Sequence, residues 1–102
     1  MKMGKWKSLK EMISYSEGGI FSRVLSKGKS QLTLFCIAEG TEISEHTSTR
    51  EGFVHVIEGR GVFTLAGEEI RMLPGVIIFL SKNIRHSLKA EENTSFLLLL
   101  SE

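Results

Sequence analysis

From residue 20 onward the chain alternates between short runs of β-branched, aliphatic and aromatic residues and clusters of turn residues. Short runs at a spacing of roughly ten residues are typical of an all-β sandwich or barrel. No segment between the runs is long enough for a connecting helix, which excludes a parallel sheet of βαβ units. The expected strands are residues 20–25, 31–38, 43–46, 53–57, 62–65, 69–73, 76–80, 85–89 and 95–100.

The N-terminal region has a different pattern, which predicts one short helix. Ser8 and Glu11 have the S-x-x-E spacing of a capping box. Leu9, Met12 and Ile13 then fall on one helical face. We therefore expect a single domain over residues 1–102, with an N-terminal helix and arm over 1–19 and a barrel over 20–102.

Residues 76–80 and 96–100 are apolar at successive positions, whereas a strand with one solvent-facing side should alternate. Such strands need cover on both faces. The barrel core covers one face, and the N-terminal segment or a second subunit covers the other. A homodimer is the simplest expectation, because closed symmetric pairs are the commonest oligomers. Ile78 and Leu98 are the positions that we expect at its interface.

Composition excludes several functions. Thirteen Lys and Arg balance twelve acidic residues, all of them Glu, and the net charge is +1. A near-neutral chain has neither the basic footprint of a nucleic-acid-binding protein nor a basic face for a membrane surface. No apolar stretch approaches the ~18 residues of a membrane helix, and no signal-peptide core follows the N-terminus. We expect a cytoplasmic protein without nucleic-acid or membrane partners, in which the single Cys36 is a buried thiol.

The three histidines are the candidates for chemistry. His55 lies between Val54 and Val56 on an expected strand, so we interpret it as a structural residue. His46 lies in the segment 40–48, and His86 lies in the segment 83–88. No serine occupies a G-x-S-x-G elbow, and phosphate-binding and dinucleotide-binding motifs are missing from the sequence.

The glycine and histidine spacing resembles that of a known family. Gly40, His46 and Gly59, followed by Gly75 and His86, resemble the two signature segments of the cupin superfamily. Segments 8–11, 32–35, 44–47 and 86–90 further resemble a branch of small single-domain cupins without a settled activity. The resemblance implies a double-stranded β-helix, which is a small barrel of two antiparallel sheets, and usually a dimer.

The resemblance is incomplete where such proteins bind metal. Metal-binding cupins usually hold a divalent ion with three histidines and a glutamate. Here only His46 and His86 match, and the other two positions are Ser48 and Gly52. Glu45 should point out of the barrel if His46 points in, because successive strand residues face opposite sides. Glu51 lies in the loop before a strand, so a divalent transition metal held by His46, His86 and Glu51 is one interpretation, and a metal-free pocket is the other.

The sequence is compatible with two main functions and with a third alternative. The first is a binding module that takes a small polar molecule in a concave pocket, around His46, Ser48, Val54, Val56, His86 and Leu88. The second is a small metal-dependent enzyme of the isomerase, lyase or dioxygenase type, with Glu51 as its only credible base. The third is a structural barrel with an eroded site. The sequence assigns no catalytic residue and leaves enzymatic activity undecided.

Overall fold

The computed structural model describes residues 6–16 and 19–102. Within these ranges the chain forms one short helix and nine strands, and the strands match the nine expected ones to within two residues at each end. The all-β prediction is confirmed. The elements are α1 (Leu9–Met12), β1 (Ile20–Lys27), β2 (Ser30–Ile37), β3 (Glu42–His46), β4 (Gly52–Glu58), β5 (Gly61–Leu65), β6 (Glu68–Met72), β7 (Ile77–Leu80), β8 (His86–Ala90) and β9 (Thr94–Ser101).

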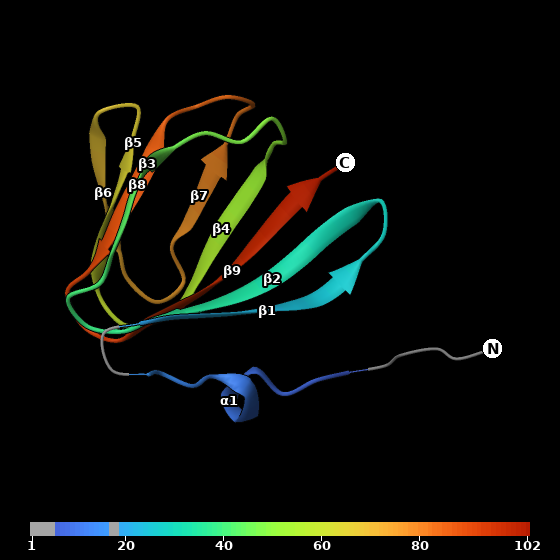
Figure 1. Ribbon diagram of the computed structural model, residues 1–102, viewed down its shortest axis with the longest axis vertical. Coiled ribbons are helices and arrows are strands. Elements are labelled where there is room, and N and C mark those ends of the chain that lie inside the picture. Colours follow the sequence, from blue (N-terminus) through green and yellow to red (C-terminus); the bar gives the residue numbers. More distant parts are fainter. Residues whose placement is uncertain (1–5, 17–18) are drawn as a thin grey trace.

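The strands form two antiparallel sheets that face each other (Figure 1). One sheet has the order β1-β2-β9-β4-β7, and the other has the order β3-β8-β5-β6. The core lies between them, and its fully buried members include Ile37, Val56, Phe63 and Met72. This arrangement is the expected double-stranded β-helix barrel.

Alternation along the strands decides which apolar residues enter the core. Val54 on β4 pairs with Ile78 on β7, and both are buried, at 1% and 2% exposure. The next residue on β7, Phe79, lies on the outer face and is 72% exposed. The expectation that Ile78 and Leu98 lie at an interface is therefore wrong: Ile78 belongs to the core and Leu98 packs against it. A run that is apolar on both faces has no alternation of apolar and polar residues. Its sequence therefore does not show which residues point outward.

The N-terminal segment covers part of the outer face of the five-stranded sheet (Figure 1). The Tyr15 hydroxyl donates a hydrogen bond of 2.7 Å to Glu58 on β4. Burial in this contact raises the pKa of Tyr15. Burial also raises the pKa of the Cys36 thiol, which is fully buried as predicted. Ser95, beside Cys36 in the sheet register, is fully buried as well.

Helix α1 begins after Ser8, but without the expected capping box. The Ser8 side chain makes no capping hydrogen bond, and only its backbone carbonyl accepts the amide of Glu11, at 3.2 Å. A helix of four residues is only about one turn long, and helices this short are marginal in water. No helix in residues 6–16 and 19–102 has the length and hydropathy needed to cross a membrane.

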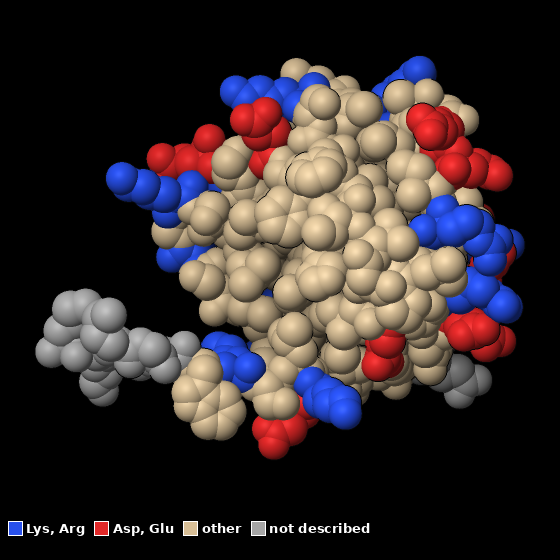
Figure 2. Space-filling view, turned by 180° about the vertical axis from the view of Figure 1, so that it is seen from behind, with Lys and Arg blue, Asp and Glu red and all other residues tan. Residues whose placement is uncertain are grey.

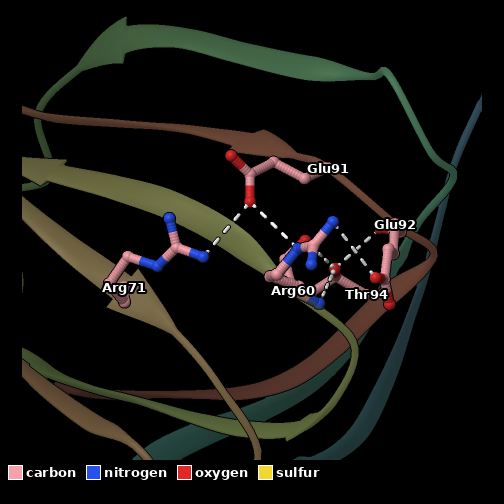
Figure 3. A network of polar contacts seen from close by, with 5 residues as sticks. All are labelled: Arg60, Arg71, Glu91, Glu92 and Thr94. Carbon is pink, nitrogen blue, oxygen red and sulfur yellow. Dashed lines mark hydrogen bonds and ion pairs between the residues drawn. The ribbon is translucent and has the colours of Figure 1, made fainter.

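Two turns at one end of the barrel are joined by a polar network (Figure 3). The guanidinium of Arg60 lies 3.3 Å from both Glu91 and Glu92, and Arg71 lies 3.6 Å from Glu91. Beneath these exposed charges, the buried Thr94 hydroxyl accepts the amide of Arg60 at 3.1 Å. The same hydroxyl lies 3.0 and 2.8 Å from the carbonyl oxygens of Arg60 and Glu92, to either of which it can donate.

We predict that Thr94→Val destabilises the fold more than Arg60→Gln. The first change leaves the amide of Arg60 without its acceptor and removes the one hydrogen bond that the hydroxyl donates to a backbone carbonyl, which costs about 1–3 kcal/mol. The second removes ion pairs that are half exposed, which contribute about 0–1 kcal/mol. Urea unfolding followed by circular dichroism measures both, and a larger loss for Arg60→Gln would show that the surface charges hold the turns together.

Candidate functional site

Two adjacent strands bring His46 and His86 together. His46 ends β3, His86 begins β8, and the two residues are direct partners in the sheet register. Their ring centroids are 4.2 Å apart, and the rings meet edge to face at 66°. The pair that the sequence singled out is therefore in direct contact.

An irregularity in β3 turns His46 toward the barrel interior. The register between β3 and β8 shifts between Ile43 and His46. Residues three apart on a regular strand face opposite sides, yet both of these line the same cavity. A bulge re-aims a side chain in this way. Glu45 instead lines a groove on the outer side of this sheet with Glu42 and Glu69, so the prediction that it points away from the barrel is confirmed.

The cavity beside the histidine pair has a volume of about 140 Å³. His46, Val54, His86 and Leu88, which the sequence nominated, line it. The nomination missed the other six lining residues, all of them apolar: Phe35, Ile43, Phe63, Leu80, Phe96 and Leu98. Alternation could have found several of them, because Phe96 and Leu98 share a face of β9 and Leu80 shares a face of β7 with the core residue Ile78.

Three nominated residues lie away from the cavity lining. Ser48 belongs to a turn, where its hydroxyl accepts the amide of Arg50 at 3.1 Å. Val56 is fully buried in the core. Glu51 is exposed and lines a separate depression with Phe79, and its backbone carbonyl accepts the amide and the hydroxyl of Ser101 at 2.8 and 3.0 Å.

His55 faces away from the cavity. It pairs with Ile77 on β7 and Leu97 on β9, whose side chains belong to the outer face of the five-stranded sheet. The structure thus separates the histidines into an inward pair and one outward residue.

Backbone hydrogen bonds determine which nitrogen of each inward histidine carries a proton. Nδ1 of His46 donates to the carbonyl of Ser44 at 2.8 Å, and Nδ1 of His86 donates to the carbonyl of Ile84 at 3.0 Å. A carbonyl oxygen can only accept, so Nδ1 is the protonated nitrogen in both rings. In each neutral ring, Nε2 is then unprotonated and has a lone pair that can accept a hydrogen bond.

His86 is held more firmly than His46. Its ring stacks on Phe63, with centroids 5.8 Å apart and planes at 8°, and only 8% of the residue is exposed. Burial lowers the pKa of His86, and the neighbouring His46 lowers it further, while the bond to Ile84 acts in the opposite direction. His46 is exposed and lies at the mouth of the cavity.

The backbone leaves no room for a side chain at Gly52, one of the four positions that metal-binding cupins use. A Cβ atom there would overlap the backbone carbonyl of Leu99 on the adjacent strand β9. A carboxylate at this position would need the two strands to move apart. Glycine at residue 52 is therefore a requirement of this sheet's packing.

Comparison with known proteins assigns the family. Residues 33–101 match the cupin domain family, and the chain belongs to it. No protein of known, curated function matches the sequence.

Solved structures share the whole architecture. A conserved protein of unknown function from Streptococcus pyogenes is 25% identical, with a TM-score of 0.86 over 100% of this chain and 90% of that one. A cupin superfamily protein from Desulfitobacterium hafniense is 19% identical, with a TM-score of 0.87 over 99% and 94%. A cupin 2 conserved barrel domain protein from Leptotrichia buccalis is 29% identical, with a TM-score of 0.84, and the match covers 91% of this chain and 46% of that one.

The residues at the site do not fit the four-ligand metal centre of metal-binding cupins. His46 and His86 offer two imidazoles, Ser48 is engaged in a turn, and position 52 cannot carry a side chain. Among the residues that the structure describes, no group of three or more His, Cys, Asp or Glu could hold a metal ion. Two protein ligands are fewer than the three of a usual catalytic zinc site.

We predict that stability depends on pH through His86. Its folded-state pKa lies below the ordinary 6.5, so the unfolded chain binds more protons once the pH falls below that value. The free energy of unfolding should therefore fall below pH 6.5, by at most about 1.4 kcal/mol per pH unit, and level off below the folded-state pKa.

Urea unfolding between pH 8 and pH 5 tests this pH dependence. His86→Gln should flatten the profile in this window, and the outward-facing His55→Gln should keep it. A profile that is the same in all three proteins would remove His86 as its source.

Proposed function

We propose that this cupin is a binding protein whose barrel cavity takes one small molecule in contact with His46 and His86. The observation that carries the proposal is a cavity of about 140 Å³ with an apolar wall and two converging imidazoles. Concave apolar sites with a few placed polar groups are the usual form of small-molecule sites. The ligand's polar group meets the histidines, and its remaining surface meets aliphatic and aromatic side chains.

The arrangement supports a metal-dependent enzyme less well. An isomerase, lyase or dioxygenase of that type needs a fuller ligand set and a general base near the substrate. Glu51, the carboxylate expected in both roles, lies in a different depression from the histidines. The expected cytoplasmic location and the lack of a nucleic-acid partner stay predictions.

Four single-ring probes of different chemistry test the binding function: benzene, phenol, benzoate and benzylamine. We expect at least one of them to shift the methyl NMR signals of Val54 and Leu88, and a His46→Leu, His86→Leu double variant to weaken the binding of any probe that hydrogen-bonds to the histidines. The matched control is His55→Leu, which removes a histidine from the opposite face. If none of the four probes moves the cavity signals, the proposal is wrong.

We also propose a homodimer, formed through the outer face of the five-stranded sheet. Ile77 and Phe79 on the edge strand β7 are 50% and 72% exposed. Figure 2 shows a face of the molecule whose centre is uncharged and whose charged side chains lie around the rim. The N-terminal segment covers the part of the sheet near Cys36, and the part near β7 needs another cover. Exposed apolar side chains such as Ile77 and Phe79 can pack against the same residues of a second copy across a two-fold axis.

We predict that Phe79→Glu converts the dimer to a monomer, because a carboxylate would be buried without a partner. Light scattering coupled to size exclusion measures the mass. Val24→Glu is the matched control: Val24 is 51% exposed, but it lies on β1 at the other edge of the sheet. A monomeric native protein, or a dimer that survives Phe79→Glu, contradicts this interface.

A further inference from the structure

We propose that the cavity selects a neutral, ring-sized molecule that carries a hydrogen-bond donor on an apolar body, with a phenol as the simplest example. This inference rests on the proposed binding function and names the chemistry of its ligand. Three features of the site lead to it: the direction of hydrogen bonding at the two histidines, the size of the cavity, and the lack of charge in its lining.

The two histidines present acceptors to the cavity. Because each Nδ1–H is donated to a backbone carbonyl, each neutral ring offers only the Nε2 lone pair. No hydrogen bond from the described residues reaches either Nε2 atom. Among these residues, Ser95 Oγ is the one fully buried side-chain polar atom that has no hydrogen-bond partner. Nε2 of His86 also has no partner, and it is not such an atom, so it retains access to open space. A ligand that satisfies the pair must donate.

The size of the cavity limits the ligand to about one ring. An apolar protein cavity of roughly 150 Å³ is large enough to bind benzene, and this one measures about 140 Å³. Its wall includes Phe35 and Phe96, which stack on each other with centroids 5.1 Å apart. A flat aromatic body can lie against such a wall and place one donor at the imidazoles.

The lining disfavours charged ligands. No Lys, Arg or Glu lines the cavity, so neither a carboxylate nor an ammonium would find an opposite charge there. Moving an unpaired ion into an apolar site costs far more than moving a neutral hydroxyl. A neutral donor such as a phenolic O–H has no such penalty and can donate its proton to one of the two acceptors.

The test compares phenol with fluorobenzene, which has nearly the same shape and no donor, by NMR titration of the full-length protein. At about pH 8 imidazole side chains are neutral. We expect phenol to bind roughly threefold to tenfold more tightly than fluorobenzene, which is the usual effect of one hydrogen bond. Benzoate should bind more weakly than either. This ratio is measured on the native protein, so it does not depend on a variant that folds.

Two variants test whether the histidines cause the preference for phenol over fluorobenzene. His46→Leu should reduce the ratio of phenol to fluorobenzene affinity toward one, and His55→Leu should leave it unchanged. Fluorobenzene or benzoate binding as tightly as phenol would overturn the inference and leave the proposed binding function standing. Stoichiometric binding of zinc chloride that displaces phenol and is lost in His46→Leu would also overturn it, in favour of a metal. If no probe binds, both the inference and the proposed function fail.

Discussion

The Nδ1–H groups of His46 and His86 each donate to the carbonyl oxygen two residues earlier in the chain, and the chemistry of the cavity depends on these two bonds. They orient both rings and assign the proton to the nitrogen that faces the backbone. The same kind of bond orients histidines that bind metals. Here no further ligand joins the pair among the described residues, and each ring keeps an unprotonated Nε2 that can accept a hydrogen bond.

The packing of the sheets restricts what else can enter this site. The close approach of β4 and β9 requires glycine at position 52, and the bulge in β3 turns Ile43 and His46 to the same side. The stacking of Phe63 on His86 then closes one wall. An apolar two-histidine cavity is the result of these three constraints, and the ring-sized volume follows from the aromatic side chains that surround it.

The strands could be predicted from the sequence, because turn residues separate every run and each run has high β propensity. The histidine pair could be predicted as well, from motif spacing. The rest of the lining depends on which face of each strand points inward, and runs such as residues 76–80 and 96–100 are apolar on both faces. Counting along the chain also cannot detect the bulge before His46, and it placed Ser48 and Val56 in a pocket that they do not line.

The state of the two imidazoles can be observed directly by long-range ¹H–¹⁵N NMR correlation spectra of the ring nitrogens, recorded at about pH 8, where imidazole is neutral. If the backbone bonds orient the rings as described, His46 and His86 should both show a protonated Nδ1 and an unprotonated Nε2. A protonated Nε2 in either ring would make it a donor to the cavity, and the acceptor pair on which the proposed ligand chemistry depends would not exist.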